Sequence, residues 1–159
     1  MDLPKPIAER VQPLLDALPL ERAMDQLVVA RGAAKELAAL VTDIAATPEI
    51  AACPALCAGL WLYVDELGRS HTISQGIQDA TGSFWHGIMH RREGDFGNSH
   101  YWFNRVGKHP AITRIPGYDP HRFIDEVEAQ HMKAPAPLIA LQRSEWAALF
   151  TWCAEQAAP

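Results

Sequence analysis

Five of the seven histidines lie in one stretch of the chain, between Glu66 and His109. The same stretch holds four arginines, several carboxylates and two tryptophans. Buried polar and titratable groups must be paired or ligated, so such a mixture is costly to build into a purely structural core. We therefore interpret this stretch as a functional site. Its histidines are His71, His86, His90, His100 and His109.

The spacing of His86, His90 and Glu93 predicts one ridge on a helix, because residues four and seven positions apart share a face. Two imidazoles one turn apart can bind one divalent metal, and a carboxylate can complete or orient the set. Zinc or non-haem iron suits these nitrogen and oxygen donors. Two histidines at this spacing are common, so a solvated polar face on a surface helix is the alternative interpretation.

Two further groups precede that helix and are candidate catalytic residues. His71 and Glu66 could each supply the third metal donor, and Glu66 could instead orient an imidazole or act as a general base. His100, on the following helix, could converge on the same space. A surface carboxylate is an equally good explanation of Glu66.

Arginines are the second group of candidate residues, since a guanidinium group is the usual way to hold a carboxylate or phosphate. We assign Arg91 and Arg105 to the catalytic set and Arg92 to substrate binding. These assignments predict a small anionic substrate.

The helix expected after Asp95 carries a polar and aromatic wall. Asn98, Tyr101, Trp102 and Arg105 share one of its faces, which could hold a small anionic or planar ligand. Alternatively, Arg105 merely stacks on Trp102 and pairs with Asp95.

Helical periodicity dominates the chain, and no alternating strand pattern is convincing. Proline and capping residues punctuate the pattern at several points, such as Pro54, Ser83 and Asp119-Pro120. We expect an all-α, single-domain helical bundle over residues 1–159, with six to seven helices and a loop-rich functional centre at about 60–110. The expected helices are 6–18, 20–46, 54–70, 84–93, 98–107, 120–133 and 138–158, with a loop at 72–83.

Composition excludes several classes of protein. At 159 residues, with 48% hydrophobic and 21% charged residues, the chain fits one globular domain. A net charge of -5 argues against a generic nucleic-acid binder. Neither a membrane span nor a signal-peptide core is evident, and three cysteines do not suggest a disulfide framework, so we expect a cytoplasmic protein.

Two segments carry a resemblance. The first, residues 60–75, reads L-W-L-Y-V-D-E-L-G-R-S-H-T-I-S-Q, and the second, residues 83–110, contains the motif W-H-x-I-x-H-R-R-E-x-D followed by Y-W-F-x-R-V-G-x-H-P. In these segments the chain resembles a group of uncharacterised proteins from bacteria and some fungi. The resemblance implies a shared site around His71, His86, His90, Glu93 and the arginines, but it implies no reaction.

Three function classes follow. The first and favoured one is a metal-assisted enzyme that acts on an anionic small molecule. The second is a metal-free acid-base enzyme or an anion-binding module. The third is a protein-interaction module whose aromatic and arginine side chains bind a partner.

Overall fold

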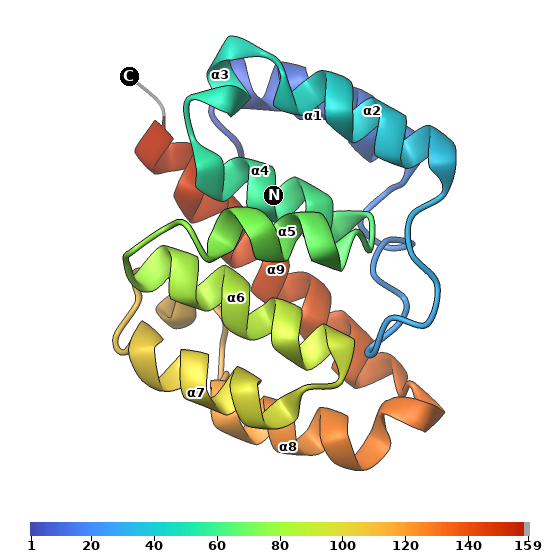
Figure 1. The fold of residues 1–159 in the computed structure, drawn as a ribbon, viewed down its shortest axis with the longest axis vertical. Helices are drawn as coiled ribbons and strands as arrows, with labels where there is room; N and C mark the ends of the chain where they lie inside the picture. Colours follow the sequence, from blue (N-terminus) through green and yellow to red (C-terminus); the bar gives the residue numbers. More distant parts are fainter. Residues whose placement is uncertain (158–159) are drawn as a thin grey trace.

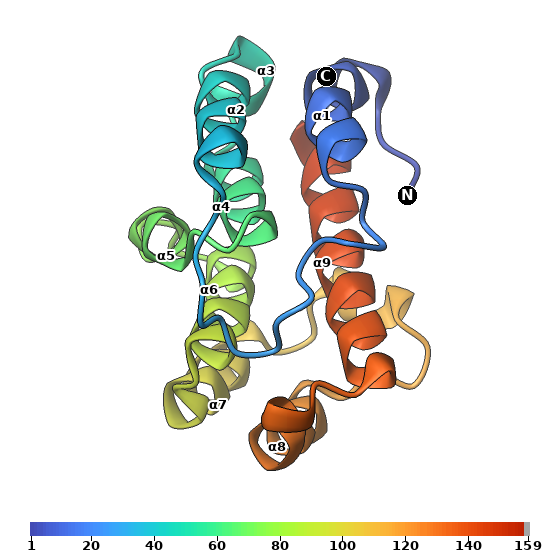
Figure 2. The same ribbon diagram turned by 90° about the vertical axis from the view of Figure 1, so that its right-hand side faces the viewer.

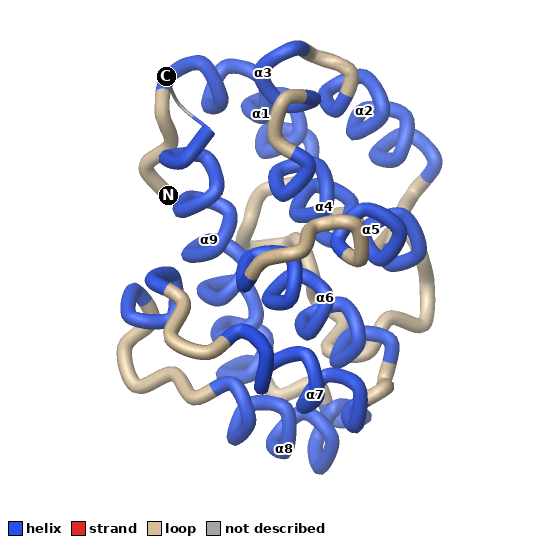
Figure 3. The backbone as a smooth tube through the Cα atoms, turned by 60° about the vertical axis from the view of Figure 1, so that its left-hand side comes forward, coloured by secondary structure: helices blue, strands red, loops and turns tan. Residues whose placement is uncertain are grey.

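Helices account for all the regular secondary structure in residues 1–157, the part of the chain that the computed structural model describes (Figure 3). This confirms the all-α class, although the described part has nine α-helices rather than six to seven. The α-helices are α1 (Lys5–Ala17), α2 (Lys35–Ala45), α3 (Pro48–Ala51), α4 (Pro54–Tyr63), α5 (Leu67–Ser74), α6 (Ala80–Glu93), α7 (Phe96–Val106), α8 (Pro120–Gln130) and α9 (Ala136–Ala157), with short 3-10 helices η1 (Pro110–Arg114) and η2 (His131–Lys133). The expected end of the last helix, Ala158, lies outside the described residues.

The helices form two facing layers (Figures 1 and 2). One layer contains α2, α4, α6 and α7, and the other contains α1 and α9. Helix α5 packs on the outer side of the first layer, against α4 and α6. This position brings the residues of α5 next to one face of α6.

Large aromatic side chains fill the space between the layers. Trp146 of α9 stacks on Phe150 with ring centroids 4.6 Å apart, and its indole nitrogen donates a hydrogen bond to the carbonyl oxygen of Gly59. A Cβ atom at Gly59 would lie 2.8 Å from the ring of Trp85, so only glycine permits this close approach of α4 to the core. Burial of such rings stabilises the packing of the two layers.

Caps define α6 and α7, the helices that carry most of the candidate residues. The Asp79 carboxylate accepts hydrogen bonds from the backbone nitrogens of Thr81 and Gly82, so α6 begins at Ala80 and not after Ser83, as the sequence had suggested. Gly94 ends α6 in the left-handed conformation, with φ at 85°. Asp95 then caps α7.

Two further expected helices were also wrong in extent, and the expected loop 72–83 is shortened by α5, which ends at Ser74, and by α6, which begins at Ala80. The expected helix 20–46 forms only as α2, because side chains from distant helices bind backbone carbonyl groups of 18–34 and hold this segment in an irregular path. The expected helix 54–70 breaks after Tyr63, where Asp65 adopts a positive φ of 66°. That turn aims the Asp65 carboxylate at Arg92, 2.5 Å away.

Candidate metal centre

Helices α5 and α6 bring three histidines together. His86 and His90 lie one turn apart on α6, and His71 reaches them from α5. Ring centroids are 4.7 Å apart for His71 and His86, 4.7 Å for His86 and His90, and 5.5 Å for His71 and His90. One ring nitrogen of each lies within 4.8 Å of the others. We call this set the histidine triad.

His86 is the most enclosed member of the triad. Its ring is 3% exposed and stacks on Trp102 of α7, with centroids 4.1 Å apart. Its Nδ1 atom is buried and has no hydrogen-bond partner among the described residues. Burial, together with the neighbouring His90 and His71, lowers the pKa of His86 to about 4. The imidazole is therefore neutral at pH 7, which is the form that binds a metal.

His90 is oriented by a carboxylate. Its Nδ1 atom lies 2.6 Å from Oε1 of Glu93 and 4.0 Å from Oδ2 of Asp95. With Nδ1 bonded to Glu93, Nε2 is the nitrogen left for a metal, in the carboxylate-histidine-metal pattern. His90, Glu93 and Asp95 also form a second group with donor atoms within 4.8 Å of one another, but Glu93 and Asp95 are much more exposed than the triad. His90 therefore belongs to two groups of potential ligands, the triad and the group that contains Glu93, which the sequence had predicted as a metal ligand.

Arg91 points away from the triad. Its side chain is 0% exposed, and its two terminal nitrogens bond to the two carboxylate oxygens of Glu145 at 2.9 and 2.5 Å. Glu145 also accepts a hydrogen bond from the Tyr118 hydroxyl group. This closed network leaves no terminal nitrogen of Arg91 for a substrate, which corrects its assignment as a catalytic residue.

Arg92 is also part of the scaffold. Its terminal nitrogens bond to the carbonyl oxygens of Leu62 (2.8 Å) and Gln26 (3.1 Å) and to the Asp65 carboxylate. The side chain is 0% exposed. Its assignment to substrate binding is therefore corrected as well: Arg92 ties α6 to α4 and to segment 18–34.

Two other candidates lie apart from the triad. Glu66 precedes α5, and a Cβ atom at Gly32 would lie 3.7 Å from its Oε1, which places this carboxylate beside segment 18–34. His100 faces α8, where its Nδ1 lies 2.7 Å from Nδ1 of His121 and its Nε2 lies 3.0 Å from Asp125. Neither Glu66 nor His100 belongs to a group of potential metal ligands in the described residues.

The candidates on α7 have separate surroundings. The Asn98 side chain donates to Asp95 at 2.7 Å, and Tyr101 is 53% exposed. The guanidinium carbon of Arg105 lies 5.5 Å from the Trp102 ring centroid and 5.9 Å from that of Tyr101. Within residues 1–157 Arg105 forms no ion pair, so the expected alternative, a pair with Asp95, is wrong.

A cavity of 380 Å³ is linked to the triad through Trp102, although none of the three histidines lines it. Trp102, whose ring stacks on His86, forms part of its wall together with Arg105. Ser83 also borders it, one turn before His86, so helical periodicity could have identified this residue. Residues that the sequence had not assigned to the site complete the lining: Gln75, Ile77, Gln78, Asp79, Ala80 and Ser83.

No protein-family model, curated protein or solved structure matches this chain. The resemblance of residues 60–75 and 83–110 to the bacterial and fungal group therefore stays a prediction. No helix of residues 1–157 combines the length and the apolar character needed to cross a membrane.

Proposed function

We propose that the chain is a metal-dependent enzyme in which His71, His86 and His90 bind one divalent ion, zinc or iron. The observation that carries the proposal is the convergence of three imidazole nitrogens within 4.8 Å from two packed helices. Only His90 of the three has a carboxylate partner, Glu93, and a buried nitrogen without a partner, such as Nδ1 of His86, is costly in a core unless it is ligated. His71 and His86 have no ion pair in the described part of the chain.

These donors suit a catalytic metal site better than a purely structural one. Catalytic zinc sites use three protein ligands and keep one position open, whereas structural sites close all four positions. Three imidazoles and an orienting carboxylate, Glu93, match the first pattern. A metal held here would supply a Lewis acid or a bound water of lowered pKa.

We also propose that the substrate is a small anion bound in the cavity lined by Trp102 and Arg105. Arg105 supports this step, because it borders the cavity and has no internal carboxylate partner in residues 1–157. A guanidinium group is suited to hold a carboxylate or phosphate beside the metal. The amide groups of Gln75 and Gln78 offer further hydrogen bonds.

One observation favours a second candidate function, a metal-free acid-base site. The contact of 2.6 Å between His90 and Glu93 is the geometry in which a carboxylate orients a catalytic imidazole. This candidate uses the same cavity and the same arginine. It differs from the first candidate only in needing no metal.

Metal content of the purified, tag-free protein distinguishes the two. We expect near-stoichiometric zinc or iron in the wild type, measured by elemental analysis. His71→Ala, His86→Ala and His90→Ala should each lose the metal while helical circular dichroism is retained. His131→Ala is the matched control, because His131 lies outside the triad, in η2, and should leave the metal content unchanged.

Two outcomes would reject the metal. One is normal metal retention in all three triad variants, and the other is a wild type that takes up neither zinc nor iron when either is supplied. The second outcome, together with loss of turnover in the triad variants, would favour the acid-base site.

A further inference from the structure

A larger cavity, of 670 Å³, lies next to segment 18–34. Its walls come from that segment, from the first turn of α2, from Asp65 and from Arg143 of α9. None of these residues borders the cavity of 380 Å³. Its volume falls within the range of about 300–1,000 Å³ that is typical of small-molecule sites.

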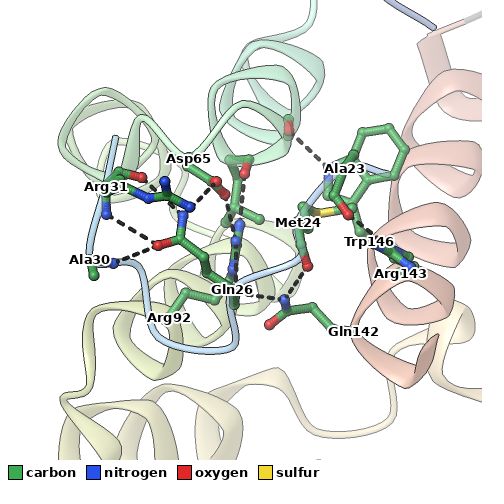
Figure 4. Close-up of polar contacts among 12 residues, drawn as sticks. Ala23, Met24, Gln26, Ala30, Arg31, Asp65, Arg92, Gln142, Arg143 and Trp146 are labelled. Carbon is green, nitrogen blue, oxygen red and sulfur yellow. Dashed lines mark hydrogen bonds and ion pairs between the residues drawn. The ribbon is translucent and has the colours of Figure 1, made fainter. Parts of the chain in front are cut away.

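The backbone at this cavity is fixed by side chains from distant helices (Figure 4). Gln142 donates to the carbonyl oxygens of Met24 (2.9 Å) and Gln26 (3.0 Å), and Nε of Arg143 donates to that of Ala23 (2.7 Å). Arg92 donates to Gln26 from the other side. The result is an irregular segment that is nevertheless held in one conformation.

Length and backbone strain both single out this segment. Irregular connections of more than about 12–15 residues are uncommon inside a domain and are usually functional. Segment 18–34 exceeds that length. Met24 and Asp65, with φ at 51° and 66°, both border the cavity, and strained backbone of this kind clusters at ligand sites.

Charges of both signs line the cavity without neutralising one another. Arg22, Arg31 and Arg143 form no ion pair in residues 1–157, and neither do Glu21 and Asp25. Opposite charges that border one cavity but stay apart are complementary to a ligand that carries both signs. A ligand with only an anionic group would leave the two carboxylates facing it.

Apolar side chains complete the wall. Leu18, Met24 and Leu37 border the same cavity. A ligand with an apolar portion would bury that portion against them.

We propose that this cavity is a binding site for a small zwitterion, a free amino acid with an apolar side chain. The guanidinium groups of Arg22, Arg31 and Arg143 hold the carboxylate, and Glu21 and Asp25 hold the ammonium group. The proposal does not depend on the metal centre, because the two cavities share no residue.

Isothermal titration calorimetry with leucine tests this site directly. Leucine should bind, whereas 3-methylbutylamine, which lacks the carboxylate, and 4-methylpentanoate, which lacks the ammonium group, should not. Methionine should bind like leucine. Absence of binding by both amino acids at millimolar concentration would overturn the proposal, and so would equal binding of leucine and either analogue.

Charge-removing variants locate the site. Arg31→Gln and Glu21→Gln should each weaken leucine binding about ten-fold or more, because each removes one charge-assisted contact. Both side chains are exposed and unpaired, so the fold should be kept. Lys133→Gln, which removes an exposed charge from η2, should bind leucine normally, and so should His86→Ala. Unchanged affinity in both Arg31→Gln and Glu21→Gln would show that leucine binds elsewhere and would overturn the assignment.

Discussion

Helix α6 presents two faces of opposite character between His86 and Arg92. His86 and His90 face α5 and α7, where they contact another imidazole and an indole ring. Arg91 and Arg92 point into the rest of the molecule, where each meets a carboxylate at 2.5 Å. All four side chains are buried, but the arginines pair with carboxylates inside the molecule, whereas His90 contacts the exposed Glu93 and His86 has no carboxylate partner in the described residues.

This contrast indicates how a buried polar side chain can be assigned either to the scaffold or to a binding site. A buried ion pair is expensive to break, because removal of one partner leaves the other charge uncompensated in the core. Such a pair therefore belongs to the scaffold. A buried imidazole nitrogen without a partner, like Nδ1 of His86, is the kind of group that a ligand would satisfy.

The largest expected effect is the loss of stability when the ion pair between Arg91 and Glu145 is broken. Arg91→Ala should destabilise the fold by about 3–5 kcal/mol, since it leaves Glu145 buried without its partner. Urea denaturation followed by tryptophan fluorescence measures this change. The double variant Arg91→Ala/Glu145→Ala should recover part of the loss, because no charge then stays unpaired. A stable Arg91→Ala protein with weakened anion binding would instead restore Arg91 to the site.

The next largest effect concerns the affinity of the histidine triad for a metal. Glu93→Gln removes the carboxylate that orients His90 and should weaken metal binding by about 10–100-fold. Competition with a chelating dye measures the affinity. The stability of the fold should change by no more than about 0.5 kcal/mol, because Glu93 is half-exposed. Glu128→Gln, an exposed carboxylate on α8, is the control; equal affinities in the two variants would contradict an orienting role.

A smaller effect, on the pH dependence of stability, concerns His109, a buried histidine outside the triad. His109 is buried with both nitrogens engaged, one facing the Thr81 hydroxyl at 3.2 Å and the other accepting from the Ala111 backbone. Burial lowers its pKa below the ordinary value of 6.5, while Asp79 and Arg114 act in opposite directions. The folded state therefore disfavours protonation, and stability is lost as the pH falls below 6.5.

The measurement is the free energy of unfolding at several pH values, for the wild type and for His109→Asn. The variant should show a flatter loss of stability on acidification than the wild type does. Parallel profiles would mean that protonation of His109 does not contribute to the loss of stability on acidification.

The smallest expected change in stability belongs to the arginine that has no partner. Arg105→Gln should alter the free energy of unfolding by no more than about 0.5 kcal/mol, in contrast to Arg91→Ala. It should nevertheless weaken the binding of inorganic phosphate to the metal-loaded protein, measured by calorimetry. Weakening of a neutral ligand to the same extent as phosphate would indicate that Arg105 only packs on Trp102.

Local sequence patterns were sufficient to predict the all-α class and to place two histidines of the site on one helix face. The capping signals and the period of the helix around 84–93 placed His86 and His90 on one ridge, and in the structure both project from the same side of α6. Helical geometry acts over four residues, so a sequence determines such neighbours by itself. Stacking of Arg105 on Trp102 follows from the same rule.

Contacts between distant residues were decided only by the tertiary structure. The partners of Arg91 and Arg92 lie 54 and 27 residues away, so their spacing in the chain carries no sign that these arginines belong to the scaffold. The irregular path of segment 18–34 depends on Gln142 and Arg143, more than a hundred residues later. The place of His71 beside His86 depends on the break at Asp65, which Arg92 stabilises from α6. Local sequence therefore determined which groups share a helix face, whereas the packing of the helices decided which of those groups are neutralised and which stay open to a ligand.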